Sequence, residues 1–481
     1  MSTRTGSIEL VTIQGSDSPI SPTTLDNTST RNESSLAPVD TGFDAWSFLV
    51  AAFFIEGIVW GFPDAFGVFL DGYLNDPLFM YQPHASTLLP LIGPLSSGII
   101  YCSGRIFCIL VLDRQPILLV RPGHLSHHCK VPLPSVHDDV GWSCSVFGES
   151  FCCELYNQGK LLFIGVLYAV GGSLLYPPCI SYMSEWFVAR RGFANGVIFA
   201  GTAIGGLILP LVLPNLISRF GTPKTLRILS ITVAILLVPS LPFVKPRIPE
   251  SRNRRQTAPP RSREWIKSPI FWALLATNTV QGFGYFVPIV WLPTFAHEMN
   301  LSSTSSSLTV ALLNGTSVLG RLSMGYLSDK FNPWFLGMST LFSTSLATFI
   351  LWGVLSQNLA GLLAFGAAYG ILAGSWTCLW TGFVSPFAKD DHNVATYLFG
   401  YLMLSRGLGN ILCTPISSAF LATASGFDAG TARTGFQVAG GRFENMILYV
   451  GSCFAGSAGI AMLGWLLDAK TRRRLSGLGV R

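Results

Sequence analysis

Charged residues are scarce in this chain. Asp, Glu, Lys and Arg make up 12% of the 481 residues, whereas soluble domains carry about a quarter. Hydrophobic residues reach 49% and the mean hydropathy is +0.48, so the composition excludes an ordinary soluble enzyme. The formal net charge of +6 is modest. It falls in loops, which argues against a nucleic-acid partner.

Motifs for phosphate binding and hydrolysis are also missing. The chain has no G-x-x-x-x-G-K-[ST], no H-E-x-x-H and no G-x-S-x-G at a strand-to-helix turn. We therefore expect no enzymatic activity and no cofactor. Residues 1–43 are polar and lack an apolar run after a basic start. They predict a disordered cytoplasmic tail rather than a cleaved signal peptide.

Long apolar segments are what the chain has in abundance. Each is close to the roughly 20 residues that cross a bilayer as a helix, and together they predict an all-α, multi-pass membrane protein. The eleven predicted spans are 46–70, 85–104, 161–183, 193–217, 227–244, 269–295, 306–327, 334–356, 359–385, 394–421 and 446–467.

Basic residues predict the orientation of these spans. Residues 245–268 hold eight Lys or Arg against two Glu, and the tail 468–481 adds four more basic residues between Lys470 and Arg474. The positive-inside rule places both segments in the cytoplasm. Six spans follow the linker 245–268 but only five precede it, so a further crossing is expected within 105–160.

The stretch 105–160 is anomalous. Its best span, Ile106 to Val120, is broken by Asp113, Arg114 and Pro116, and charges at mid-membrane are costly. Four histidines and several cysteines crowd the same stretch without the paired spacing of a zinc site, so we expect no metal site. A shifted reading frame or a retained intron is an alternative explanation, which sequencing of the spliced transcript would test.

Three local patterns carry a family resemblance. The first is Asp40-Thr41-Gly42-Phe43-Asp44-Ala45-Trp46, and the second runs from Trp186 through Arg190-Arg191-Gly192 to Ala194-Asn195-Gly196. The third is Gly320-Arg321, followed by Gly325 and Asp329-Lys330. Together they resemble the signatures of the monocarboxylate porter family within the major facilitator superfamily, with the fungal members nearest.

The resemblance implies the major facilitator fold, with two six-helix bundles at 44–244 and 269–467 and a degraded third span. It also implies secondary active transport of a small organic acid by alternating access, coupled to a proton, in the plasma membrane. Two departures argue against simple lactate-type symport: Asp64 follows Phe62-Pro63 where animal members have lysine, and Ser317 stands where they have aspartate. Export of a secondary metabolite is the alternative, and a non-transporting sensor is a third possibility.

Ionisable side chains within spans are the candidate site residues, because their burial is expensive. Arg321 matches the family's substrate-side arginine, and Arg406 is the second candidate to bind a carboxylate. Asp64 and Glu56 are candidates for proton coupling. Each has a structural alternative as a cap or a helix-to-helix partner. The other candidates are Asn314, Asn278, Gln281 and Tyr285 for substrate hydrogen bonds, and Arg190, Arg191, Gly325, Asp329 and Lys330 for a cytoplasmic turn and gate.

Overall fold

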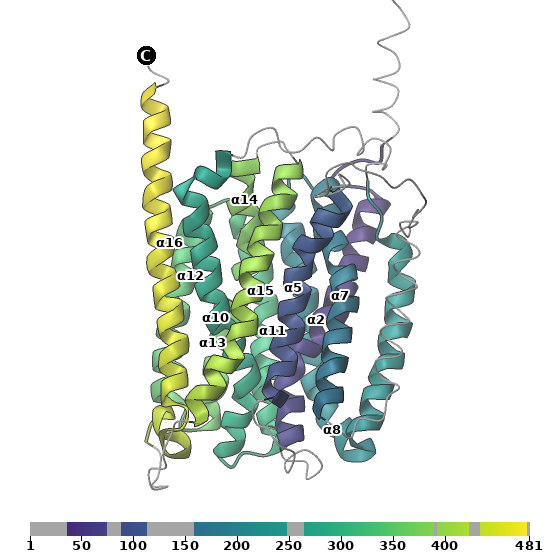
Figure 1. The fold of residues 1–481 in the computed structure, drawn as a ribbon, viewed down its shortest axis with the longest axis vertical. Helices are drawn as coiled ribbons and strands as arrows, with labels where there is room; N and C mark the ends of the chain where they lie inside the picture. Colours follow the sequence, from purple (N-terminus) through teal and green to yellow (C-terminus); the bar gives the residue numbers. More distant parts are fainter. Residues whose placement is uncertain are drawn as a thin grey trace, which may run out of the picture. The chain divides into compact units, whose positions relative to one another are not determined.

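The computed structural model describes residues 36–74, 88–112, 158–247, 264–388, 392–422 and 433–478. The chain divides into two units, Met1–Ala37 and Pro38–Arg481, and the description below concerns the second. The helices of this unit pack side by side in one bundle (Figure 1). The predicted crossing within 105–160 lies largely outside the described residues, as do its four histidines.

Every predicted span coincides with a helix. The first half contains α2 (Phe43–Leu74), α5 (Ile92–Leu112), α7 (Gln158–Trp186) and α8 (Arg191–Ser240), which is broken at Gly221 and so supplies two spans. The second half contains α10 (Pro269–Glu298), α11 (Ser303–Ser328), α12 (Pro333–Ala347) continued by η4 (Thr348–Leu355), α13 (Leu359–Ala373), η5 (Trp376–Leu379), α14 (Trp380–Ala388), α15 (His392–Ala422) and α16 (Glu444–Leu478). The all-α prediction is confirmed.

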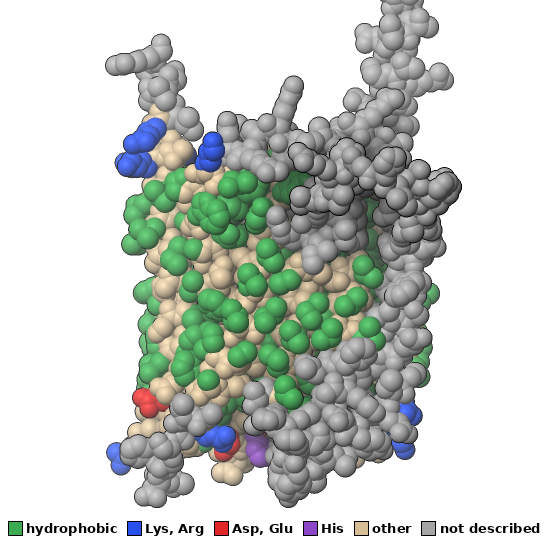
Figure 2. Space-filling model, viewed as in Figure 1, with side chains coloured by type: hydrophobic (Ala, Val, Ile, Leu, Met, Phe, Trp, Pro, Cys, Tyr) green, Lys and Arg blue, Asp and Glu red, His purple; other side chains and the backbone are tan. Residues whose placement is uncertain are grey.

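The surface of the bundle fits a bilayer. Seven of the described helical segments are long and apolar enough to cross a membrane. In Figure 2, hydrophobic side chains cover the middle of the visible face, and the coloured charged side chains lie at its two ends. Large apolar side chains such as Ile231, Ile235 and Leu319 are more than half exposed. They would be unfavourable in water and are favourable against lipid.

Basic side chains lie at both ends of the bundle (Figure 2). One end, here called the basic end, carries the start of α2, the end of α7, the start of α8 and the end of α16. Lys245 lies there because its carbonyl accepts from Trp186 at the end of α7, and the basic run Lys470–Arg474 lies there in the last turns of α16. Helix α16 continues to Leu478, so the basic tail predicted at 468–481 begins as a helical extension of the last span.

Helices α5 and α7 run parallel to each other. Gly165 of α7 lies against Ile92 and Ser96 near the start of α5, and Gly172, further along α7, lies against Ile100. The ring of Tyr176 then meets the ring of Tyr101, at 6.0 Å between centroids. The end of α5 and the start of α7 therefore lie at opposite ends of the bundle. This arrangement is the one that the further crossing expected within 105–160 requires, because five spans alone would leave the linker on the wrong side.

Small residues set the closest helix crossings. Gly57 of α2 meets Gly201 of α8, and Gly61 meets Gly205 one turn further on, so that the two backbones touch. In the second half, Gly370 of α13 packs against the backbone of Leu313 in α11. A methyl group at Gly201 would overlap the carbonyl of Phe53, so this crossing depends on glycine.

Three helix pairs join the two halves. Helix α8 packs along α11, α5 along α15, and α2 along α10. Asn314 of α11 spans the first of these seams by donating to the carbonyl oxygens of Asp64 (3.3 Å) and Gly206 (3.1 Å). A small cavity lies at the centre of the bundle, and residues from all three of these helix pairs line it.

Candidate functional site

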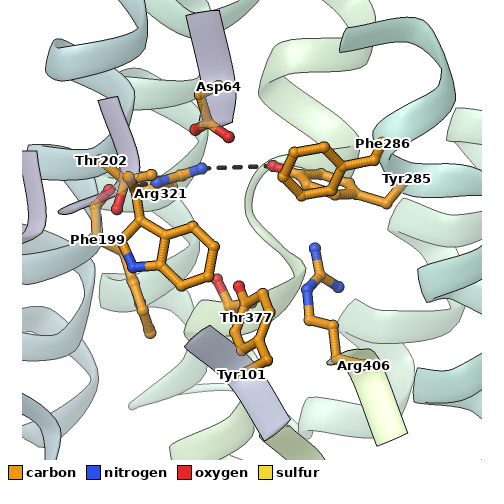
Figure 3. Close-up of a pocket in the computed structure, with 10 residues that line it drawn as sticks. Asp64, Tyr101, Phe199, Thr202, Tyr285, Phe286, Arg321, Thr377 and Arg406 are labelled. Carbon is orange, nitrogen blue, oxygen red and sulfur yellow. Dashed lines mark hydrogen bonds between the residues drawn. The ribbon is translucent and has the colours of Figure 1, made fainter. Parts of the chain in front are cut away.

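A small polar cavity lies at the centre of the bundle, between the two halves (Figure 3). Its volume of about 10 Å³ leaves room for roughly one water molecule. In this conformation the site is therefore too small to hold a substrate. Both halves contribute its walls: Trp60, Asp64, Tyr101, Phe199 and Thr202 from the first, and Tyr285, Phe286, Arg321, Thr377 and Arg406 from the second.

Arg321 is buried, with 4% of its surface exposed. Its Nε donates to the carbonyl of Gly374 (3.1 Å), and one terminal nitrogen donates to the carbonyl of Phe199 across the seam. The other terminal nitrogen reaches the hydroxyl of Tyr285 at 3.5 Å, the dashed line in Figure 3. Two of its donor groups therefore bind backbone, as the structural alternative expected, while the third faces the cavity.

Arg406 is also buried, with 1% exposed. Its guanidinium donates to the side-chain oxygen of Gln281 and stacks over the ring of Tyr285, 4.3 Å from the centroid. Its Nε has no hydrogen-bond partner. A cation with an unused donor beside a cavity is suited to an anionic ligand. Gln281 and Tyr285 thus belong to this site by positioning the two arginines.

The two carboxylates stand apart from the arginines. Asp64 is 2% exposed, its Oδ2 has no partner, and no ion pair joins it to either described arginine. Figure 3 shows its carboxyl group turned toward the space beside Arg321. Glu56, two turns earlier on α2, accepts from Thr202 at 3.2 Å through one oxygen and leaves the other unpartnered. Both carboxyl groups therefore retain acceptor capacity inside the bundle.

Asn278 is committed to holding helices together. Its amide nitrogen donates to the carbonyl of Leu402 and to the hydroxyl of Ser405, both at 2.7 Å, and its oxygen accepts from Trp376 at 2.8 Å. Asn314 is committed in the same way across the seam. In this conformation the amide of Asn278 has no group left for a substrate, and the amide nitrogen of Asn314 is occupied, which agrees with the helix-to-helix alternative.

Four of the five predicted gate residues lie around one turn at the basic end. The carboxylate of Asp40 accepts from the backbone N–H groups of Val188, Ala189 and Arg190, at 3.0–3.3 Å. From the other half, Asp329 accepts from Gly192 (3.0 Å) and Phe193 (3.1 Å) at the start of α8. Anions at a helix N-terminus are stabilised by the unpaired N–H groups, so Asp329 couples α11 to α8 across the seam.

The remaining gate candidates differ in role. Gly325 allows α11 to touch the backbone of Gly192 and Gly196. Arg190 is exposed, whereas Arg191 is half-buried and donates to the carbonyl of Phe187 at 3.3 Å. Lys330 lies over the ring of Tyr326 on its own helix, 4.2 Å from the centroid. The structure therefore does not bring Lys330 to the turn that Asp329 holds.

A larger cavity opens at the basic end. It measures about 390 Å³ and is lined by both halves, including Ser184, Arg191, Asp329, Thr381 and Phe399. A smaller cavity of about 20 Å³ between α7 and α15 adds Pro177 and Met403. Met403 lies one turn from Arg406, so these cavities approach the centre from the basic end.

Sequence reasoning missed the aromatic walls of the site. Trp60 and Tyr101 line the central cavity, and Tyr176 and Trp380 pack behind them. No pattern in the sequence marks these four among the many aromatic residues of the spans, since they come from four separate helices. Only the packing of the halves brings them together.

Two helical bundles that meet around a closed polar centre, with a cavity reaching in from one end, define a membrane transporter that works by alternating access. A family model described as Major Facilitator Superfamily matches residues 141–414, more than half of the chain. The chain belongs to this superfamily. It is a secondary transporter, similar both to fungal MFS-type transporters and to a monocarboxylate transporter.

Three relatives support this assignment, and one solved structure shares the fold. The chain is 27% identical to MFS-type transporter 1 of Ophiocordyceps sp., over 80% of this chain and 81% of the relative. It is 26% identical to the Fujikurins efflux protein of Gibberella fujikuroi (81% and 78%) and 27% identical to Monocarboxylate transporter 10 of Danio rerio (76% and 68%). The crystal structure of a D-xylose-proton symporter matches the fold, with a TM-score of 0.61, 14% identity and coverage of 87% and 97%.

Proposed function

We propose that the protein moves a small organic anion together with a proton, and that its physiological direction is export of a metabolite. The observation that carries this proposal is the pair of buried arginines beside an unpaired carboxyl group, at the junction of the two halves. Arg321 and Arg406 would bind the anion, with Gln281 and Tyr285 positioning them. Asp64 would carry the proton, and Glu56 is the second candidate.

Charge balance gives a reason for the coupling. The two arginines contribute two positive charges and Glu56 and Asp64 contribute two negative charges. A proton on Asp64 leaves one positive charge in excess, which attracts an anion strongly in a medium of low dielectric constant. Proton binding and anion binding therefore favour each other. A proton and a monoanion that cross together move no net charge, so the two concentration gradients set the direction.

Relatives support export over uptake. Two similar fungal proteins are named as efflux proteins for the secondary metabolites fujikurins and aspyridones, whereas the zebrafish relative is named as a monocarboxylate transporter. Uptake of a monocarboxylate is therefore the second candidate. The basic end would face the cytoplasm, so that the larger cavity admits a cytoplasmic compound. The plasma membrane is the membrane in which such export would empty the cell.

Metabolite analysis tests the direction. Cells with the gene deleted should accumulate one organic acid inside and lose it from the medium, relative to cells with the gene restored, as measured by mass spectrometry. A carboxylate that instead stays unconsumed in the medium of the deletion strain would establish uptake. Unchanged pools on both sides would contradict transport of a metabolite and would favour the sensor alternative.

The proton-coupling prediction concerns Asp64→Asn, which imitates the protonated carboxyl group. In proteoliposomes, the variant should still exchange labelled substrate for unlabelled substrate. It should lose accumulation driven by a pH gradient, which for one pH unit is up to about tenfold in the unchanged protein. Asp44→Asn, at the exposed start of α2, is the matched control and should behave like the unchanged protein. If Asp64→Asn still accumulates substrate in response to a pH gradient, Asp64 does not carry the proton. Glu56→Gln would then test the second candidate.

A further inference from the structure

Four aromatic side chains form a cluster beside the central cavity. The ring of Tyr101 lies 4.5 Å from that of Trp60, 6.0 Å from that of Tyr176 and 6.4 Å from that of Trp380, between centroids. Trp60 and Tyr176 are themselves 5.5 Å apart. All four are buried. This aromatic cluster is a single packed unit built from α2, α5, α7 and α14.

The aromatic cluster separates the two hollow regions of the protein. Trp60 and Tyr101 line the central cavity. Tyr176 lies one turn before Ile180 on α7, and Trp380 one turn before Val384 on α14; Ile180 and Val384 line the cavities toward the basic end, and residues four apart share a helix face. The aromatic cluster therefore adjoins both the central cavity and the cavities toward the basic end.

Three polar groups of the cluster lack a hydrogen-bond partner. They are the indole N–H of Trp60, the hydroxyl of Tyr176 and the indole N–H of Trp380, on side chains that are 3%, 1% and 1% exposed. Buried Trp and Tyr usually find a partner, and an unpaired buried donor is costly. Trp265 and Trp352 each show the same feature elsewhere. Here the three unpaired donors belong to side chains whose rings all pack on Tyr101.

The seam between the halves runs through this cluster. Trp60, Tyr101 and Tyr176 belong to the first half, and Trp380 belongs to the second. A flat ring held between two parallel ring faces needs them about 7 Å apart, twice the carbon contact distance of about 3.5 Å. Tyr101 and Trp380 are already 6.4 Å apart, at 58° to each other. A movement of one half against the other that also turns these two rings toward parallel would open a flat slot beside the unpaired donors.

We infer that the aromatic cluster is a second substrate subsite, which takes a flat conjugated ring bearing carbonyl or hydroxyl oxygens. The ring stacks between Tyr101 and Trp380, and its oxygens accept from the three unpaired donors. The acid group of the same molecule reaches the arginines, so this inference rests on the proposed binding of an organic anion. It narrows the substrate class from organic acids in general to planar, oxygen-bearing aromatic or polyene acids.

Three probes of similar size test the subsite on the full-length protein purified in detergent: 6-hydroxy-2-naphthoate, 2-naphthoate and the saturated decahydro-2-naphthoate. Isothermal titration calorimetry should show 2-naphthoate binding at least about tenfold more tightly than the saturated acid, because only the flat ring stacks. The hydroxylated acid should bind about fivefold more tightly than 2-naphthoate, because it supplies an acceptor to an unpaired donor.

Variants assign these ratios to the cluster. Tyr176→Phe keeps the ring and should abolish the advantage of the hydroxylated acid alone. Trp380→Leu should abolish the advantage of the flat ring. Trp352→Leu is the matched control, since Trp352 is equally buried and unpaired but packs against Phe365 and Phe295, and it should leave both ratios unchanged. Size-exclusion chromatography checks folding, and Tyr176→Phe decides alone if Trp380→Leu does not fold.

The outcomes separate this inference from the proposed function. Equal weakening of all three probes in Tyr176→Phe and Trp380→Leu, or equal affinities in the unchanged protein, would overturn the subsite. Arg406→Gln should weaken all three acids by at least tenfold and preserve their ratios. If Arg406→Gln leaves the affinities unchanged while the cluster variants shift the ratios as expected, the anion site is wrong and the ring subsite stands.

Discussion

Individual residues at the centre divide into those that hold the helices and those that retain capacity for a ligand. Asn278 uses its amide on three partners, and Asn314 bridges the halves. Arg406, Gln281 and Asp64 keep unpartnered polar atoms. Both groups looked alike in the sequence, because each is a polar residue within an apolar span. The difference lies in neighbours that come from other helices.

A stability prediction follows for Asn278. Asn278→Ala removes the acceptor of Trp376 and a donor to α15, so the protein should lose about 1–2 kcal/mol of stability. Thermal unfolding in detergent measures this loss. The preference among substrates should stay unchanged, because no group of Asn278 faces the cavity in the described conformation. A changed substrate preference with unchanged stability would return Asn278 to the binding site.

At the scale of the helices, the contact between α8 and α11 holds the two halves together. Asp329 holds the N-terminus of α8 across the seam, and Gly325 lets the two helices touch. Asp329→Asn should weaken this contact by about 1 kcal/mol and shift the balance about fivefold toward the form open at the basic end. Ser184 lines the cavity at that end. In a background without other cysteines, the rate at which a thiol reagent alkylates Ser184→Cys should therefore rise about fivefold when Asp329→Asn is added.

The matched control for this element is Asp468→Asn. Asp468 pairs with Arg472 on α16, at 2.9 Å, away from the seam. It removes one acidic charge at the same end and should leave the alkylation rate at Ser184→Cys unchanged. An equal acceleration by both variants would attribute the effect to net charge and not to the contact between α8 and α11.

The crossing of α2 and α8 gives a prediction about packing. Gly201→Leu should prevent assembly, because any side chain there overlaps the backbone of Phe53. Gly459→Ala is the control, since nothing lies within 4 Å of the position, and alanine in a helix interior stabilises by up to about 1 kcal/mol. The yield of monodisperse protein should fall to near zero for the first variant and stay normal for the second. Normal yield of Gly201→Leu would show that α2 and α8 do not approach so closely.

At the scale of the whole molecule, the prediction concerns which end of the bundle faces the cytoplasm. In a cysteine-free background, Lys267→Cys at the basic end and Asn300→Cys at the opposite end are both exposed positions. If the basic end faces the cytoplasm, a membrane-impermeant maleimide should label Asn300→Cys in intact cells and Lys267→Cys only after permeabilisation. The reverse pattern would invert the orientation and, with it, the side from which the larger cavity takes substrate.

The amino-acid sequence by itself determined the class of protein, the places of the helices and most of the charged centre. These properties depend on local quantities: hydrophobic length sets a span, small residues set a close crossing, and a charge within a span is too costly to be incidental. The tertiary structure alone decided which polar groups remain unpaired and which four rings form the aromatic cluster. Those depend on contacts between segments up to hundreds of residues apart, such as Trp60 with Tyr176 and Tyr101 with Trp380, and no local pattern records them.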